Sequence, residues 1–380
     1  MKILFTTFNK ENQGSFLRAM ALAKELAKRG HTVSVLCASR ENQFEEKQID
    51  SVKLLTFPWG KRFLHGYNLC EVQARNAWLG NQKFDVVHAF DMRPTCAKPA
   101  FRAKRNGALM LTDWADWFGK GGSVEERTSF MARTFLPPAE SYGERHLRKK
   151  ADGTTTICSH LYKMGKNLGI SEDRLLLLYN GFDQKISPRT DKLEARKALN
   201  LDPDLRIIGT LGAFFTKDFE LLTEASHCCQ TLRSTKFIHI GQGNPILDGS
   251  DIHLSGRVTD QELSLYLQAC DLLLLPMANI PANHGRFPLK FSEYISAGRP
   301  VLATNVGDVP KFIEEHACGY ICNPNPKDLG DALVEALANP ETMLQYGKNA
   351  HNLSQNERFS WHKRSLDLEA FYMRLLDKKN

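Results

Sequence analysis

Short apolar runs alternate along this chain with segments in which apolar residues recur every three or four positions. Residues 2–8 form an apolar run, residues 16–27 carry apolar side chains at helical spacing and end near Gly30, and residues 31–37 form a second run. The runs predict strands, and the three- or four-residue repeat predicts an amphipathic helix. A strand, a helix and a strand in this order predict a βαβ unit, which implies a parallel sheet.

The alternation continues to the end of the chain and predicts two domains. Further strands are expected at residues 52–57, 84–91, 108–112, 151–159 and 175–183, and then at residues 205–212, 237–243, 252–258, 269–276 and 301–304. Later helices are expected at residues 140–150, 328–337, 341–353 and 365–376, and residues 119–138 are expected to form a mobile insertion. A polar, proline-containing stretch at residues 187–189 separates the two series of strands, and 380 residues fit two domains of ordinary size.

Composition narrows the class of protein. Charged residues make up 24% and hydrophobic residues 42% of the chain, which is typical of a soluble globular enzyme. No apolar run approaches the roughly 20 residues that cross a bilayer, and the first residues do not resemble a secretion signal. We therefore expect a cytoplasmic protein, with membrane association left open.

Charge is unevenly distributed. Residues 1–180 hold 28 Lys and Arg against 18 Asp and Glu, a formal charge of +10, whereas residues 181–380 hold 22 against 25, a charge of −3. A basic first half indicates an anionic partner, such as a phospholipid surface, a polyprenyl-phosphate-linked acceptor or a nucleic acid. The alternative is solubility charge spread over exposed helices.

The stretch 284–304 carries the clearest chemical signal. It predicts a loop, a short helix with Lys290 and Glu293, a Gly-Arg-Pro turn and a buried strand. A helix that begins at a tight loop points unpaired amides at that loop, where a diphosphate can bind beside Lys290. Glu293 lies three residues later on the same face, and a carboxylate can accept hydrogen bonds from two ribose hydroxyls. The alternative is an ordinary amphipathic helix with a surface Lys/Glu pair.

This stretch resembles the donor-binding motif of retaining glycosyltransferases with the GT-B fold, in particular family 4. The matching residues are Glu293, Ala297, Gly298, Pro300 and Val301, and a variant branch that reads Pro-x-Lys-x-x-Glu-Tyr is matched by Pro288, Lys290, Glu293 and Tyr294. The first Glu of the family motif is replaced by Gly285. The resemblance implies an α/β protein with two Rossmann-like domains that face each other across a cleft. Residues 1–184 would form the acceptor domain, together with a C-terminal helix, 359–380, that crosses back to it, and residues 185–358 would form the donor domain.

The resemblance also implies how a nucleotide-sugar is held. The family clamps the diphosphate with an Arg and a Lys after the first strand of the donor domain; Ala213 replaces the Arg, and Lys217 lies within one residue of the Lys position. Lys290 and Arg286 are the candidates that would substitute for the missing Arg. The other predicted donor-binding residues are Gly14, Ser15, Gly212, Gly241, Arg257, Val258, Phe287, Leu289 and Glu293. No metal site and no cofactor are expected, because relatives need no metal and no Asp-x-Asp lies at a strand end.

Candidate proton acceptors lie at predicted strand ends of the first domain. His88, Asp91, Asp113 and Asp116 are at or near such ends, where ligands gather in open α/β sheets. We therefore include His88, Asp113 and Asp116, with Lys217 and Lys290, as candidate catalytic residues. The alternatives are a core histidine for His88 and a helix cap or turn former for the two aspartates.

The predicted function is transfer of a sugar from a nucleoside-diphosphate sugar to a hydroxyl, with retention as the resemblance implies, in glycan, glycolipid or glycoconjugate synthesis. The partners would be this donor and an acceptor of unknown identity, lipid-linked or otherwise anionic. A nucleotide-sugar epimerase of the same fold and a non-catalytic protein that binds an anionic ligand remain alternatives, and nucleic acid stays open as a partner. A dinucleotide oxidoreductase is disfavoured because the chain has no Gly-x-Gly-x-x-Gly after its first strand.

Overall fold

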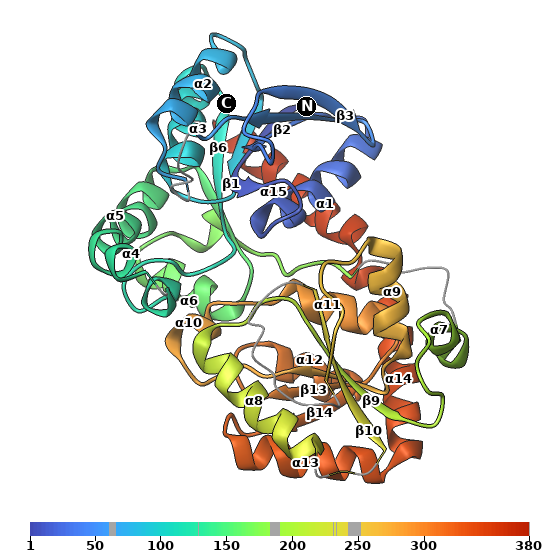
Figure 1. Cartoon of the computed structure of the whole chain (residues 1–380). Coiled ribbons are helices and arrows are strands. Elements are labelled where there is room, and N and C mark those ends of the chain that lie inside the picture. Colours follow the sequence, from blue (N-terminus) through green and yellow to red (C-terminus); the bar gives the residue numbers. More distant parts are fainter. Residues whose placement is uncertain are drawn as a thin grey trace. The chain divides into compact units, whose positions relative to one another are not determined.

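The computed structural model describes residues 1–60, 66–127, 129–182, 191–230, 232, 234–241 and 252–379. The chain divides into two compact units, which Figure 1 shows in the colours of the sequence. Unit 1 comprises Met1–Asn180 and Trp361–Asn380, and unit 2 comprises Gly181–Ser360. The linker predicted around residues 187–189 and the predicted turn at Gly243 lie outside the described residues.

Unit 1 is built on an eight-stranded sheet in the order β3-β4-β2-β1-β5-β6-β7-β8. Its strands are β1 (Lys2–Lys10), β2 (Thr32–Ala38), β3 (Glu45–Ile49), β4 (Val52–Phe57), β5 (Val86–Ala89), β6 (Leu109–Trp114), β7 (Gly153–Thr156) and β8 (Leu175–Leu177). Neighbouring strands are parallel except β3 and β4, which are antiparallel. The strand order reverses between β1 and β5, so ligands are expected outside the carboxyl ends of these two strands.

Helices cover both faces of this sheet. They are α1 (Ser15–Lys28), α2 (Leu69–Leu79), α3 (Pro94–Arg105), α4 (Phe130–Phe135), α5 (Pro137–Tyr142), α6 (Ser159–Asn167) and α15 (Trp361–Lys379). The apolar faces of α1 and α15 pack with the strands in one core, and α2 and α3 pack in the core on the other face. Burial on both faces explains why these strands are continuous apolar runs and not alternating ones.

Unit 2 is built on a parallel sheet in the order β11-β10-β9-β12-β13-β14. Its strands are β9 (Arg206–Leu211), β10 (Thr235–Ile240), β11 (Ile252–Leu254), β12 (Leu272–Leu275), β13 (Val301–Thr304) and β14 (Gly319–Cys322). Its helices are α7 (Lys192–Ala198), α8 (Thr216–Gln230), α9 (Asp260–Ala269), α10 (Pro281–His284), α11 (Leu289–Ser296), α12 (Val309–His316), α13 (Pro326–Ala338) and α14 (Pro340–Ser354). The strand order reverses between β9 and β12, which is the expected ligand position in this unit.

The predicted fold class is confirmed, since both units are parallel-sheet, Rossmann-like α/β domains. β3 was not predicted, because Glu45–Ile49 is charged and its side chains are mostly exposed at the sheet edge. The segment 119–138, predicted to be a mobile insertion, contains α4 and a short 3₁₀ turn at Ser123–Glu126. None of the helices in the described residues is both long and apolar enough to span a bilayer.

Candidate functional site

Several predicted donor-binding residues meet at the carboxyl edge of the unit 2 sheet. Gly212 follows β9 and Gly241 follows β10, while Arg257 and Val258 follow β11. Gly212 and Gly241 have φ angles of +66° and +97°, and a Cβ on Gly241 would lie 3.7 Å from the Gly212 backbone. This backbone conformation favours glycine and leaves the edge without side chains at the two turns. Arg257 is exposed and Val258 is half-buried.

Lys290 lies where the strand order reverses. Its Nζ donates a hydrogen bond to the Ala213 carbonyl at 3.0 Å and lies 3.5 Å from the centroid of the Phe214 ring. Burial, and then the charge of Arg286, lower the pKa of Lys290 to about 7, against the opposite effect of nearby carboxylates. The loop after β9 therefore receives a cation at Ala213 from the first turn of α11.

Lys290 lines a small pocket together with Ala213, Asp218, Met277 and Arg286. The buried acid Asp218 forms hydrogen bonds beside this pocket. Asp218 Oδ1 accepts hydrogen bonds from the Ala278 amide at 2.8 Å and from Asn283 Nδ2 at 2.6 Å. Asp218 Oδ2 lies 3.6 Å from Arg286 Nη1, which also donates to Asn283 Oδ1 at 3.0 Å. Burial raises the pKa of Asp218, and the Arg286 guanidinium opposes that rise. Arg286 is thus held beside Lys290 by groups from α8 and α10.

Neither Asp218 nor Asn283 was predicted as a site residue. Asp218 had a weak signal, because an acid in the first turn of a helix that follows a parallel strand lies near the expected ligand position. Asn283 had none.

The remaining candidates of α11 and its entry loop divide between core and surface. Tyr294 is buried, and its hydroxyl accepts a hydrogen bond from the Leu211 amide at 3.0 Å and donates one to the Leu274 carbonyl at 3.1 Å. It therefore fixes α11 against β9 and β12. Phe287 is 2% exposed and packs with Phe291 and Phe312, so only its backbone can contact a ligand. Glu293 and Leu289 are half-buried, no side chain caps α11, and Lys217 is exposed at the start of α8.

A buried histidine behind the pocket was also missed. His239, on β10, is 1% exposed, and neither ring nitrogen has a hydrogen-bond partner in the described structure. Its ring centroid lies 6.3 Å from that of Phe214, and burial and the nearby Lys290 charge lower its pKa. A histidine within the apolar run before Gly241 was the available signal.

In unit 1, His88 and Asp113 belong to a buried polar network. Thr155 Oγ1 donates to Asp113 Oδ1 at 2.5 Å and contacts His88 Nε2 at 3.1 Å, and His88 Nδ1 lies 2.8 Å from Tyr372 Oη. Since the Thr155 proton is directed at Asp113, His88 Nε2 must donate and Nδ1 must accept from Tyr372. Burial lowers the pKa of His88 to about 4, so the ring is neutral. Both nitrogens are engaged, as expected for a core histidine.

Asp113 is held by an ion pair that crosses unit 1. Arg18, on α1, donates to both Asp113 oxygens at 3.0 Å and also to Asn180 Oδ1 and the Leu178 carbonyl. Burial acts to raise the pKa of Asp113, but the Arg18 guanidinium and its hydrogen bonds hold it below the ordinary value. Asp113 is 1% exposed and Arg18 likewise, so this carboxylate ties α1 to β6 and does not face solvent. It is neither a helix cap nor a turn former.

The other unit 1 candidates lie at the strand ends. Asp116 is half-buried in the loop after β6, and Gly14 is exposed at the start of α1. Ser15 donates from its amide and its hydroxyl to Asn9 Oδ1, at 3.0 and 2.7 Å. Gly14 and Ser15 therefore lie at the reversal of strand order between β1 and β5, with the Ser15 amide already bound by Asn9.

No group of three or more His, Cys, Asp or Glu side chains arranged to hold a metal ion occurs in the described ranges. The absence of a metal and a cofactor stays a prediction.

Two family models match the chain. The model described as Glycosyltransferase Family 4 matches residues 14–185, and the model described as Glycosyl transferases group 1 matches residues 203–339. Among curated proteins, TuaH of Bacillus subtilis (strain 168), named for a glycosyltransferase of teichuronic acid biosynthesis, is 22% identical over 206 residues. That alignment covers 51% of this chain and 50% of TuaH, so the chain spans about half the length of this relative.

Solved structures match the whole fold. Sucrose-phosphate synthase of Thermosynechococcus elongatus superposes with a TM-score of 0.79 at 18% identity and covers 99% of both chains. Alr3699/HepE of Anabaena, solved in complex with UDP-glucose, has a TM-score of 0.71 at 15% identity and covers 100% of this chain and 99% of its own. At these identities the likeness establishes the fold, which is that of the GT-B glycosyltransferases.

Proposed function

We propose that this protein moves a sugar from a nucleoside-diphosphate sugar to a hydroxyl acceptor. The matches to the glycosyltransferase family 4 and group 1 models and the GT-B fold support this proposal. Retention of the anomeric configuration, implied by the family resemblance, is part of the proposal. Unit 2 binds the donor and unit 1 binds the acceptor.

The contact of Lys290 with Ala213 carries this proposal. The family resemblance implies an Arg after the first donor-domain strand, and Ala213 stands in its place. Lys290 Nζ lies 3.0 Å from the Ala213 carbonyl and so brings a cation to this position. Arg286 lies on the same pocket, where Asp218 and Asn283 orient its guanidinium. Two cations beside the uncapped first turn of α11 suit a diphosphate, which helix amides and charge-assisted hydrogen bonds both stabilise.

The same groups would act on the leaving group. In the transfer, the bond between the anomeric carbon and the diphosphate oxygen breaks, and a bond to the acceptor oxygen forms. Negative charge then grows on the diphosphate, so Lys290, Arg286 and the exposed Lys217 stabilise the transition state electrostatically. His88 and Asp113 are buried and fully engaged, so neither takes the acceptor proton, which we assign to the departing diphosphate and not to the half-buried Asp116.

The donor is the first thing to identify. HepE was solved with UDP-glucose, so UDP-sugars are the first candidates, followed by ADP-, GDP- and dTDP-sugars. Each is added to the protein without acceptor, and the melting temperature and slow release of free sugar are measured. One nucleotide-sugar is expected to raise the melting temperature and to be hydrolysed. Epimerised nucleotide-sugar without free sugar would contradict the proposal and identify an epimerase.

Substitution of Glu293 tests the donor site. Glu293→Ala removes the carboxylate that would accept hydrogen bonds from the ribose, and charge-assisted hydrogen bonds contribute roughly 1.5–3 kcal/mol. The donor dissociation constant measured by calorimetry should rise about tenfold to a hundredfold. Glu314→Ala, which removes an exposed carboxylate from α12 of the same unit, is the matched control and should leave the constant unchanged. An unchanged constant in Glu293→Ala would remove this residue from the site.

A further inference from the structure

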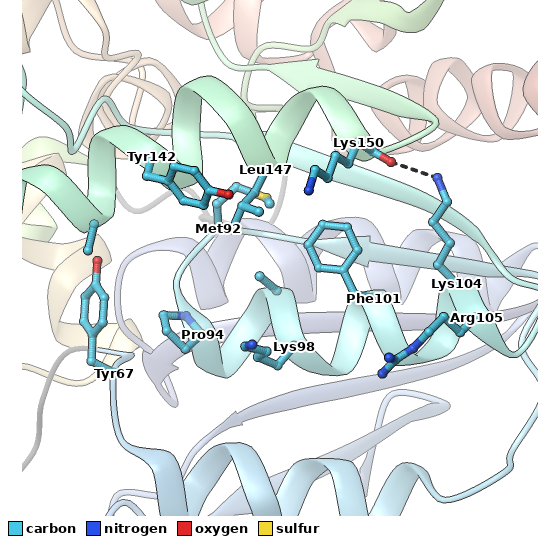
Figure 2. Close-up of a pocket in the computed structure, with 12 residues that line it drawn as sticks. Tyr67, Met92, Pro94, Lys98, Phe101, Lys104, Arg105, Tyr142, Leu147 and Lys150 are labelled. Carbon is cyan, nitrogen blue, oxygen red and sulfur yellow. Dashed lines mark hydrogen bonds between the residues drawn. The ribbon is translucent and has the colours of Figure 1, made fainter.

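Unit 1 contains a cavity of about 740 Å³ that the proposed transfer does not use. It lies between α3 and the helical segment Pro137–Lys150, and Figure 2 shows the side chains that line it. These are Tyr67, Met92, Pro94, Ala97, Lys98, Phe101, Lys104, Arg105, Ala139, Tyr142, Leu147 and Lys150. The lining contains four basic side chains and no acidic one.

The helical repeat of α3 produces one wall. Pro94, Ala97, Phe101 and Lys104 recur every three or four residues and so lie on one face of the helix. The wall runs the length of α3, about 16 Å at the rise of an α-helix. Pro99 interrupts the hydrogen bonds of α3, and the Thr95 carbonyl that it leaves open accepts from Arg75 Nη1 at 3.1 Å. The helix therefore stays continuous beside the cavity.

Most apolar side chains lie toward one end of the cavity and two of the four basic ones lie toward the other, while Lys98 lies on α3 between Pro94 and Phe101 (Figure 2). Tyr67, Met92 and Tyr142 lie toward one end of the cavity, and Lys104 and Arg105 lie toward the other, with Phe101 between the two walls (Figure 2). Phe101 is half-buried, and Tyr142 is 52% exposed. An occupant would therefore meet aromatic and aliphatic surface along most of its length, with Lys104 and Arg105 at one end and Lys98 beside its middle.

The basic side chains are only partly neutralised. Lys104 Nζ pairs with Asp152 at 2.6 Å and donates to the Lys150 carbonyl at 2.8 Å. In the described part of the chain, Lys98, Arg105 and Lys150 form no side-chain ion pair, and all three are exposed. Three cations around an apolar cavity repel one another unless an anion lies between them.

We propose that this cavity binds a lipid with one apolar chain and a phosphate headgroup. The chain would lie against Phe101, Met92 and Leu147, and the phosphate would bind among the basic side chains of the lining, to which Arg105 and Lys150 contribute from opposite walls. The volume suits one small amphiphile, because ligand cavities of 300–1,000 Å³ typically enclose a molecule of this size. A nucleic acid would instead require cations spaced along an open groove. This binding is independent of the proposed sugar transfer.

Lysophosphatidic acid, below its micelle concentration, is the probe, and calorimetry on the full chain measures its dissociation constant. Two further probes divide the chemistry: lysophosphatidylcholine keeps the chain but is zwitterionic, and glycerol phosphate keeps the anion without the chain. Saturable binding of lysophosphatidic acid, at least about tenfold tighter than either of the others, is expected. Equal binding of glycerol phosphate would overturn the apolar half of the proposal, and equal binding of lysophosphatidylcholine would overturn the anionic half.

Charge reversal at the exposed cations locates the site. Lys150→Glu and Arg105→Glu should each weaken lysophosphatidic acid binding about tenfold or more, because each replaces an attractive charge by a repulsive one. Lys163→Glu makes the same change at an exposed position on α6 of the same unit and should have no effect. Equal loss in all three variants, or no loss in the first two, would overturn the assignment.

Two further measurements distinguish the lipid site from the donor site and from a dimer interface. Donor binding should be unchanged in Lys150→Glu, so failure of the lipid experiment and failure of the proposed transfer are distinguishable. Sedimentation velocity tests whether a second copy of the chain covers the cavity. A dimer that Arg105→Glu dissociates, together with absent lipid binding, would replace the lipid by a second copy and overturn the proposal.

Discussion

At the scale of single residues, Lys290 combines a charged ammonium with burial, which usually exclude each other. Its ammonium lies over the Phe214 ring and against the Ala213 carbonyl, so an aromatic face and a dipole partly replace water. Burial still lowers its pKa to about 7. A lysine whose pKa is lowered toward neutrality can gain or lose its charge near physiological pH, and with it its attraction for a diphosphate.

Donor affinity should therefore depend on pH through Lys290. Below about pH 7 the ammonium is protonated and attracts the diphosphate, and above it the charge is lost, so the donor dissociation constant should rise with pH. Calorimetry from about pH 6 to about pH 9 should show a rise of about tenfold. Each phosphate of a nucleotide-sugar carries one ester bond and the shared anhydride bond, so its single acidic group remains ionised across this range. In Lys290→Arg the guanidinium stays charged, so the curve should be flat. A rise of the same size in this variant would assign the pH dependence to another group.

The sequence placed Lys290 and Glu293 on one helix but could not supply their surroundings. The spacing of three residues is a local property, and α11 forms where that spacing predicts a helix. The bond from Asn283 to Asp218 joins residues 65 apart, and only the folded sheet brings them together. His88 shows the converse, since its position at a strand end suggested catalysis, whereas its contacts with Thr155 and Tyr372 come from distant strands and helices.

At the scale of elements, one carboxylate fixes the loop after β6. Glu144, in a π-helical turn at Gly143–Leu147, accepts hydrogen bonds from the amides of Phe118 and Gly119 at 2.7 and 2.8 Å. Its Oε1 also accepts from Trp114 Nε1 at 3.2 Å. Burial raises the pKa of Glu144 to about 7, against the opposing effect of these donors and of Arg148. The segment 119–138, which was predicted to be mobile, is therefore fixed at its start by hydrogen bonds to the buried Glu144.

This anchor should give the protein a measurable pH dependence of stability. Because the folded pKa of Glu144 lies above the unfolded value of about 4.3, the folded state binds more protons between that value and about pH 7. The free energy of unfolding should fall as pH rises across this window, by at most about 1.4 kcal/mol per unit. Glu144→Gln cannot titrate, so in urea unfolding the wild type should lose stability relative to the variant as pH rises through this window. Parallel pH profiles would contradict the assignment.

Strands and helices were predictable from the sequence where a local pattern of apolar residues is enough to determine them. β1, α1 and β2 follow from apolar runs and a helical repeat, and the structure confirms them at nearly the predicted positions. β3 could not be predicted, because Glu45–Ile49 gains its strand conformation by pairing with β4 and not from its own polar side chains. Strand pairing is a long-range event that a local pattern does not contain.

At the scale of the whole molecule, the ends of the chain form one unit. α15 comes last in the sequence, yet Leu368, Phe371, Tyr372 and Leu375 lie in the same core as α1 and the strands of unit 1. Tyr372 also completes the bonds of His88. The family resemblance implied this return, whereas the periodicity of residues 365–376 predicted only a helix. Unit 2 is a single continuous segment, so its stability is expected to be separable from that of unit 1.

Removal of residues 361–380 should therefore unfold one unit and spare the other. Four large buried side chains contribute about 1.5–3 kcal/mol each, together about 6–12 kcal/mol, which is comparable with the 5–15 kcal/mol that typically stabilises a domain. In calorimetric melts, the truncated chain should lose the transition of unit 1 and keep that of unit 2, still raised by the nucleotide-sugar. Met373→Ala, at a side chain of α15 that is 47% exposed, should retain both transitions. If truncation abolished both transitions, unit 2 would depend on unit 1 for folding, and the donor site would not be an independent module.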